Sequence, residues 1–280
     1  MRRSVSRDHV SAPPTAGGRK MRRRTTKKTD RQQRILQELR ANTAIRISEL
    51  AKELGVSGET IRRDLAELGE AGAVNRTYGG AVARPFGAEP NWNERHNLMR
   101  EERQQMAKLA VGLASPGDVL MLESGSTILH FAQQLVITGK DLTVVTPSPN
   151  VAIALAQNPT ITVILCPGTL NAREGTVLGP ETVAFLEQFN ANLAFVGSSG
   201  ITADGLNETL TGMAIVKRAI LARARRRVAL LDHTKFDQPS LAVAGALKDL
   251  NVLVTDQAPQ GDLAAALNRA GVQILLSAGE

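Results

Sequence analysis

The chain is poor in the residues that mark secreted and membrane proteins. One thiol, Cys166, cannot form an internal disulfide, so a disulfide-rich secreted fold is excluded and a reducing compartment is favoured. No apolar run approaches the roughly 20 residues that a membrane helix needs. The basic N-terminus is not followed by the apolar stretch of a secretory signal. The sequence therefore predicts a cytoplasmic protein that has no membrane partner.

Patterns typical of catalytic or cofactor sites are also missing. The four histidines (His9, His96, His130 and His233) lack metal-ligand spacing. We find neither a phosphate-binding Walker loop nor a dinucleotide-binding glycine motif. The sequence thus predicts no metal, no cofactor and no enzyme activity.

The positive charge is concentrated in one segment. Residues 1–29 hold 10 basic residues and one acidic residue, whereas residues 30–82 are balanced at 8 of each, and residues 83–280 hold 16 basic and 18 acidic residues. This predicts a disordered basic tail over 1–29, which either adds nonspecific phosphate contacts or is dispensable. Translation could also begin at Met21 rather than Met1.

Residues 30–82 have the pattern of a winged helix-turn-helix. Asp30, with Gln33 three residues on, predicts a capped first helix. Gly55 ends a second short helix, and Ser57 can cap the next one. A glycine-ended hairpin follows at Arg76–Gly80. This order of elements can place one helix in the major groove of DNA.

The helix after Ser57 should be the reading helix. Ile61, Leu65 and Leu68 form a stripe that faces the core, so Arg63 points away from it. An exposed arginine can bind O6 and N7 of guanine with both arms. An Arg-Arg pair such as Arg62 and Arg63 usually lies on a helix surface only to keep it soluble. Here the flanking turn and hairpin favour DNA binding. The candidate DNA-binding residues are Ser57, Glu59, Thr60, Arg62, Arg63 and Arg76.

The rest of the chain reads as a linker over 83–99 and an α/β domain over 100–280. After a helix near 100–114, short apolar strands alternate with helices, which indicates a mostly parallel sheet covered on both faces. Strands are expected at 119–122, 142–146, 161–165, 193–196, 228–231, 252–255 and 273–276. Helices are expected at 126–137, 148–157, 181–189, 211–226 and 262–270.

Ligands of such sheets bind at the carboxyl ends of the strands. There the segment Ser124-Gly-Ser-Thr127 leads into a helix, and it is either a phosphate cradle or an ordinary turn. A nearby lysine would neutralise a phosphate, although both candidate lysines could also be solvated surface groups. The candidate effector-binding residues are Ser124, Gly125, Ser126, Thr127, Gly197, Lys217 and Lys235.

The arrangement from Arg31 to Asp256 resembles the DeoR family of bacterial sugar-metabolism regulators. The N-terminal motifs Ser48-Glu-Leu-Ala51, Thr60-Ile-Arg-Arg-Asp-Leu65 and Gly79-Gly-Ala81 carry the resemblance most specifically. The resemblance implies an effector domain with a fold similar to ribose-5-phosphate isomerases, which senses a phosphorylated sugar or related metabolite. It also implies that the phosphate turn is Ser124–Thr127, that Gly197 and Gly200 belong to a small-residue loop, and that Lys217, Asp232 and Lys235 are motif residues.

The sequence departs from this family around the expected site. Glu123 replaces a usual Asp, and Met213 replaces a common Glu before Lys217. Pro147, Pro167 and Asn171 stand where the family usually has Asn, Gly and Arg. These changes favour an altered effector or weaker binding of it.

The sequence therefore predicts a homo-oligomeric transcriptional repressor of carbohydrate genes. Its partners would be a double-stranded DNA operator and a phosphorylated sugar or related effector. One alternative is an active sugar-phosphate isomerase, for which Asp204 and Glu208 are the nearby carboxylates. Another is a DNA-architectural protein whose C-terminal domain binds no metabolite.

Overall fold

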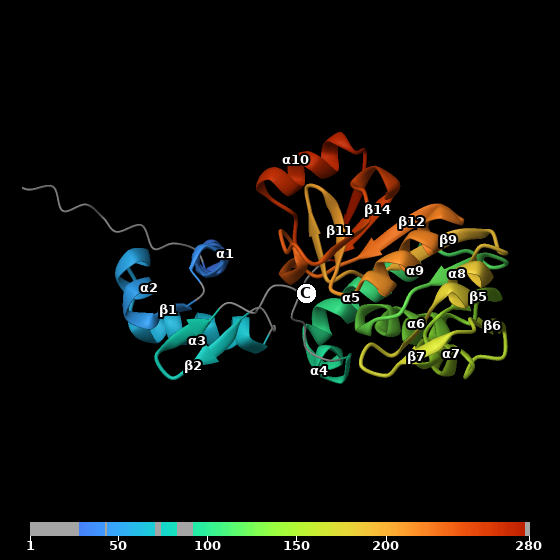
Figure 1. The fold of residues 1–280 in the computed structure, drawn as a ribbon, viewed down its shortest axis with the longest axis horizontal. Helices are drawn as coiled ribbons and strands as arrows, with labels where there is room; N and C mark the ends of the chain where they lie inside the picture. The colour runs from blue at the N-terminus through green and yellow to red at the C-terminus, as the bar shows by residue number, and fades with distance from the viewer. Residues whose placement is uncertain (1–27, 43, 71–73, 83–91, 278–280) are drawn as a thin grey trace, which may run out of the picture.

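A computed structural model describes residues 28–42, 44–70, 74–82 and 92–277. Residues 1–27 of the predicted tail and 83–91 of the predicted linker lie outside the described part. Figure 1 shows a small N-terminal body in blue and cyan and a larger α/β body in green to red. Each has its own hydrophobic core, as a chain of this length allows.

The N-terminal body is the predicted winged helix-turn-helix. Its elements are α1 (Lys28–Ala41), β1 (Ala44–Arg46), α2 (Ile47–Leu54), α3 (Gly58–Glu70), β2 (Asn75–Thr77) and β3 (Gly80–Val82). One cluster of apolar side chains joins helices and wing: Ile35, Leu39, Ile45, Leu50, Leu54, Ile61, Leu65, Leu68, Val74 and Ala81.

Two local features differ from the prediction. Helix α1 begins at Lys28, so Asp30 lies within its first turn and is not the residue that starts the helix. The hairpin gains a third strand, because β1 pairs antiparallel with β3. A Cβ on Gly80 would lie 2.0 Å from the carbonyl oxygen of Ile45, so this approach requires glycine.

The larger body is built on a parallel sheet in the order β15-β14-β12-β9-β4-β5-β6. All seven predicted strands are confirmed as its members. They are β4 (Val119–Leu122), β5 (Leu142–Thr146), β6 (Ile161–Leu165), β9 (Ala191–Val196), β12 (Ala224–Leu230), β14 (Val252–Thr255) and β15 (Gln273–Leu276).

Helices cover both faces of this sheet, as its continuously apolar strands require. Leu120 and Leu122 of β4 pack with α5 (Arg100–Val111), α6 (Ser126–Thr138) and α7 (Pro149–Leu155). Met121 points to the other face, which carries α8 (Pro180–Leu186), α9 (Thr211–Ala222) and α10 (Gly261–Arg269).

Short elements of the α/β body were not predicted. A small antiparallel sheet consists of β10 (Gly200–Thr202), β11 (Gly205–Glu208) and β13 (Ala242–Gly245), and β7 (Thr169–Asn171) pairs with β8 (Thr176–Leu178). Two 3₁₀ turns span His233–Lys235 and Leu247–Asp249. These strands are short and most contain glycine or polar residues, so they lack the continuous apolar runs that marked the strands of the parallel sheet.

Two helix boundaries also differ. Helix α9 ends at Ala222 instead of continuing to Arg226, because residues from Ala224 pair with Ala191 as strand β12. Arginine is compatible with a helix, so local propensity could not show this strand start. The predicted linker contains a further helix, α4 (Trp92–Asn97).

Candidate functional site

The second and third helices of the N-terminal body form a tight turn. Gly55 has the left-handed backbone (φ 67°) that ends α2. The backbone N–H of Thr60 donates to Ser57 Oγ over 3.1 Å, which caps the start of α3. The turn therefore fixes the angle at which α3 leaves the body.

Helix α3 presents the predicted polar face to solvent. Ile61 and Leu65 are buried, whereas Ser57, Glu59, Arg62 and Arg63 are exposed. Thr60 is half-buried beside Ser57. Arg62 Nη1 lies 3.0 Å from Glu59 Oε2, an exposed pair that contributes little to stability and can exchange for phosphate. Arg76 lies in β2, and its side chain is outside the described part.

Asp64 was not singled out from the sequence, although it supports the reading helix. It is 2% exposed and accepts hydrogen bonds from both Nε and Nη2 of Arg31 on α1. The carboxylate raises the pKa of Arg31 through hydrogen bonding and attraction, against the effect of burial. The signal was its position between the core residues Ile61 and Leu68, where a charge requires a partner.

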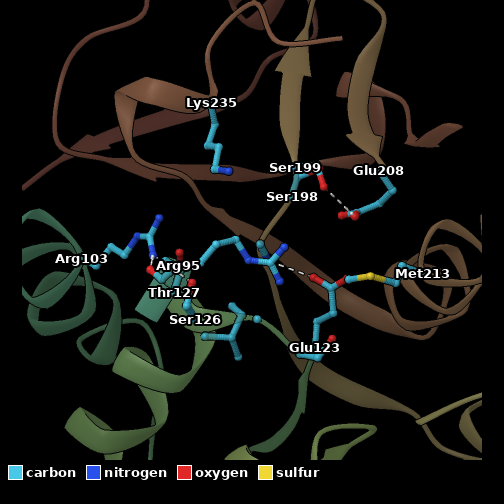
Figure 2. A pocket seen from close by; sticks show the side chains of 14 residues that line it. Arg95, Arg103, Glu123, Ser126, Thr127, Ser198, Ser199, Glu208, Met213 and Lys235 are labelled. Atoms are coloured by element: carbon cyan, nitrogen blue, oxygen red, sulfur yellow. Dashed lines mark hydrogen bonds between the residues drawn. The ribbon is translucent and has the colours of Figure 1, made fainter. Parts of the chain in front are cut away.

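A pocket lies at the carboxyl ends of β4, β9 and β12 (Figure 2). Its cavity volume is about 40 Å³, and the empty space reaches about 410 Å³ when the mouth that opens to solvent is included. The lining residues are Arg95, Arg103, Glu123, Ser124, Gly125, Ser126, Thr127, Ile128, Gly197, Ser198, Ser199, Glu208, Met213 and Lys235. Six of the seven predicted effector residues are therefore brought together here.

The predicted cradle forms one wall of the pocket. Gly125 precedes α6 with φ 119° and ψ 158°, a conformation that glycine permits. A Cβ at this position would point into open space, so the backbone is accessible. Ser126 is buried and Thr127 is half-buried at the amino end of α6. Backbone N–H groups and the helix dipole at such an end favour an anion.

Arg103 of α5 links Ser126 of this wall to the buried Asp232. Sequence reasoning missed this residue. Its Nε and Nη2 each lie 3.0 Å from Asp232 Oδ2, and its Nη1 donates to Ser126 Oγ over 2.8 Å. Burial alone would raise the pKa of Asp232, but attraction to Arg103 and Lys235 and hydrogen bonds lower it to about 2. The signal was the spacing of Arg103 with the buried Met106 and Ala110, which places it on the apolar face of α5.

Lys217 lies differently from the expected position. It is fully buried on α9, and its Nζ lies 3.0 Å from Glu123 Oε1 and also contacts Glu208 and the carbonyl oxygen of Gly197. The sequence led us to expect Lys217 or Lys235 to face the phosphate turn, and of the two only Lys235 lines the pocket. Against the effect of burial, the two carboxylates raise the pKa of Lys217. Lys217 is therefore a buried partner of Glu123 and Glu208.

Glu123 and Glu208 line the pocket above that lysine. Burial and repulsion from Glu208 raise the pKa of Glu123 to about 8, despite attraction to Lys217. Glu208 accepts a hydrogen bond from Ser199 Oγ over 3.0 Å. The other carboxylate of the isomerase alternative, Asp204, is exposed on the turn between β10 and β11. Glu208 is thus already bonded on both oxygens, and Asp204 is outside the pocket lining.

Two further cations reach the pocket, Lys235 from above and Arg95 from the left in the view of Figure 2. Lys235, in the turn after β12, is half-buried. Arg95 comes from α4, and its Nη2 lies 2.6 Å from Glu174 Oε2, a residue in the turn between β7 and β8. Sequence reasoning missed Arg95 because it falls in the stretch read as linker. Its only signal was a lone arginine three residues after Trp92.

The described residues contain neither a metal-binding cluster nor a membrane-spanning helix. Among residues 28–42, 44–70, 74–82 and 92–277, no group of three or more His, Cys, Asp or Glu side chains could hold a metal ion. Within the same ranges, no helix combines the length and apolar character needed to cross a membrane.

Both bodies match known domain families. Residues 31–84 match the DeoR-like helix-turn-helix domain, and residues 98–257 match the DeoR C terminal sensor domain. The chain is 30% identical over 234 residues to the glycerol-3-phosphate regulon repressor of Escherichia coli (strain K12), covering 83% of this chain and 92% of that protein. It is 34% identical over 229 residues to the HTH-type transcriptional regulator GolR of Listeria innocua, covering 81% and 90%.

Among solved structures, ribose 5 phosphate isomerase A from Neisseria gonorrhoeae is similar at a TM-score of 0.37 and 18% identity, over 48% of this chain and 52% of that one. A likeness of this size indicates nothing about activity. The two family matches and the related proteins are those of transcriptional regulators, not enzymes. With a DeoR-like helix-turn-helix match in one body and a DeoR sensor-domain match in the other, the chain belongs to the DeoR family of transcriptional regulators.

Proposed function

We propose that this regulator represses genes of sugar or glycerol-phosphate metabolism and leaves its operator when a phosphorylated metabolite fills the pocket of the α/β body. The observation that carries the effector is the meeting of the α6 amino end with Arg103 and Lys235 in one pocket. Two of the relatives are a glycerol-3-phosphate regulon repressor and the Bacillus subtilis repressor GlcR, which is 29% identical.

The chemistry of the pocket favours a phosphate over a neutral ligand. Backbone N–H groups at Gly125 and Ser126 and the Thr127 hydroxyl offer donors at a helix amino end. Arg103 and Lys235 add positive charge, and charge-assisted hydrogen bonds are about twice as strong as neutral ones. Glu208 is bonded on both oxygens, but each carboxylate oxygen has a second lone pair that can accept a hydrogen bond from a hydroxyl group at the other end of the ligand.

The operator would be read by the exposed face of α3. Arg63 suits guanine in the major groove, while Ser57, Thr60 and Arg62 suit the phosphate backbone. A single small reading head covers few base pairs, so we propose a homo-oligomer that binds a two-fold symmetric operator in the cytoplasm.

The test is a titration of the purified protein on a DNA fragment taken from upstream of its own gene. We would measure operator binding by fluorescence anisotropy while adding triose, pentose and hexose phosphates and glycerol 3-phosphate one at a time. At least one compound should release the DNA, and its unphosphorylated counterpart should not.

Two variants connect that response with the pocket. Thr127→Ala and Lys235→Met should keep operator binding. Release of the DNA should need a higher concentration of the active compound in both variants, and the increase should be larger for the lysine change. Lys248→Met, an exposed lysine in the second 3₁₀ turn, is the matched control and should respond normally. Operator binding that no compound in the panel alters would overturn the proposed effector and support the architectural alternative.

A further inference from the structure

We infer that Arg95 contacts the anion of the effector and thereby makes α4 the element that reports the state of the pocket. The inference rests on the proposed function, because it assumes that an anion binds at the α6 amino end. Arg95 would be a binding residue, and α4 the segment that its side chain repositions.

Arg95 has its backbone in helix α4 and its side chain in the pocket. Its side chain, 9% exposed, points into the pocket between the Ser126–Thr127 turn and Glu123 (Figure 2). Its backbone belongs to α4, the first described element after residues 83–91, which lead from the N-terminal body. A change at Arg95 therefore acts on the start of the α/β body.

The enclosed part of the pocket is small in this state, and most of its space lies at the open mouth. A water molecule needs about 10–15 Å³ of space for its centre, so the 40 Å³ available would hold roughly three waters. An effector with a carbon chain would extend into the open mouth, or a lining side chain would move to enlarge the enclosed part. Arg95 is long and reaches the centre of the pocket, so it is the group whose movement makes room most directly (Figure 2).

The aromatic contacts at the base of α4 leave three buried ring nitrogens without a hydrogen bond in the described residues. Trp92 stacks on His96 and His96 stacks on His130, with ring centroids 5.5 and 4.7 Å apart. Trp92 Nε1, His96 Nδ1 and His130 Nδ1 are buried, and the described structure gives them no hydrogen-bond partner. Each buried polar group without a partner opposes docking. By contrast, the other walls of the pocket come from strand ends and from helices in the central core.

A hydrogen-bond path already connects the anion turn with α4. Arg103 Nη1 donates both to Ser126 Oγ over 2.8 Å and to the carbonyl oxygen of Arg95 over 2.6 Å. A phosphate at Ser126 and Thr127 would attract the Arg95 guanidinium away from Glu174. Arg95 would then exchange one anionic partner for another, and α4 would shift on α6.

The sole tryptophan of the chain, Trp92, lies on α4 and reports this shift directly. We would measure acrylamide quenching of its fluorescence as inorganic phosphate is added, and phosphate affinity by calorimetry. In the wild-type protein the quenching constant should change with the same midpoint as phosphate binding. In Arg95→Met, phosphate should bind about tenfold more weakly, and at saturation the quenching constant should stay unchanged.

A matched arginine separates this role from a general loss of charge. Arg173→Met removes a mainly exposed guanidinium 3.8 Å from the same Glu174, and it should behave as wild type. Arg95→Lys keeps a cation and should retain a weaker response. Circular dichroism would show that each variant is folded.

The outcomes distinguish this inference from the proposed function. If Arg95→Met binds phosphate and shifts Trp92 as wild type does, Arg95 is only structural and the inference fails. If wild-type Trp92 ignores phosphate while a sugar phosphate still releases the operator, the inference also fails but the proposed function stands. If no compound affects either Trp92 or operator binding, both fail.

Discussion

At the scale of single residues, the buried charges of this protein show which motif residues are enclosed by partners in the fold and which line the pocket. Arg31 is paired with Asp64, and Lys217 is enclosed by Glu123 and Glu208. Burying a charge is costly unless it is paired and hydrogen-bonded. A charged residue at a core-facing position in the sequence therefore indicates a buried partner rather than a ligand.

Arg63→Ala should remove operator preference and leave the fold intact, because Arg63 is exposed on α3. A bidentate base contact contributes roughly 1–3 kcal/mol of discrimination. Binding to operator and to scrambled DNA, compared by anisotropy, would show the two affinities converging. Arg34→Ala on the exposed side of α1 removes the same charge and should keep the preference. Undiminished selectivity in Arg63→Ala would mean that another face reads the bases.

Lys217→Met should destabilise the α/β body instead of shifting the effector titration. Breaking a buried ion pair costs about 3–5 kcal/mol, since the two carboxylates would lose their shared cation. Lys235→Met, at a half-buried position, should unfold at nearly the wild-type urea concentration. Equal stability of the two variants would contradict the structural role of Lys217.

At the scale of elements, α4 and the wing show how packing overrides local signals. Helix α4 has only six residues, too few to be stable alone, and it exists because it packs on α6. Strand β1 has three residues and exists because Gly80 lets β3 approach Ile45. Both elements position parts of the candidate sites, because α4 carries Arg95 and β1 pairs with strand β3 of the hairpin.

Docking of α4 should weaken in acid because of His130. Burial lowers the pKa of His130 from 6.5 to about 4, so the folded state resists the proton that the unfolded state accepts. This contribution is fully present above pH 6.5 and is lost as the pH falls toward 4, on the order of 3 kcal/mol. The free energy of unfolding measured against pH should therefore fall over this range.

Substitution identifies the group responsible. His130→Phe keeps an aromatic ring in the stack and should flatten the profile between pH 6.5 and 4. His233 is the comparison: although burial opposes it, hydrogen bonding to Asp256 raises its pKa, so its contribution is present below pH 6.5 and is lost as the pH rises through the raised value. His233→Asn should thus keep the loss in acid that His130 causes. A profile unaltered by His130→Phe would assign that loss to other groups.

At the scale of the whole molecule, the charge of the chain is divided among parts with different tasks. The excess positive charge belongs to residues 1–29, while residues 30–82 carry equal numbers of basic and acidic residues. This distribution of charge fits the proposal that a few arginines on α3 make the sequence-specific contacts and that the tail adds nonspecific attraction.

Deleting residues 1–20 should weaken binding to operator and nonspecific DNA by the same factor. The segment carries five basic residues and one acidic residue. The logarithm of affinity should depend less steeply on the logarithm of salt concentration, by about 0.9 for each phosphate that the shortened protein no longer neutralises. Binding measured at several salt concentrations tests this, with Arg63→Ala as the variant that should keep the wild-type slope if its contact is to a base. An unchanged slope after the deletion would show that the tail is dispensable.

The sequence by itself determined the parts whose signals are local and periodic. The apolar stripe of α3, the Gly55 turn and the seven apolar strands all follow from spacing, and the order of strands and helices determined the sheet class. The rule that parallel strands present their carboxyl ends at one edge was enough to bring Ser124–Thr127, Gly197 and Lys235 to one pocket.

Only the tertiary structure decided which charges face that pocket. Lys217 and Lys235 look alike in the sequence, but one lies beneath the pocket between two carboxylates and the other lines it. Arg95 and Arg103 enter from helices that precede the sheet, so no spacing within the strand ends could show them. Burial and pairing of charges depend on contacts between residues far apart in the chain, such as Arg103 with Asp232, and these exist only once the helices are packed on the sheet.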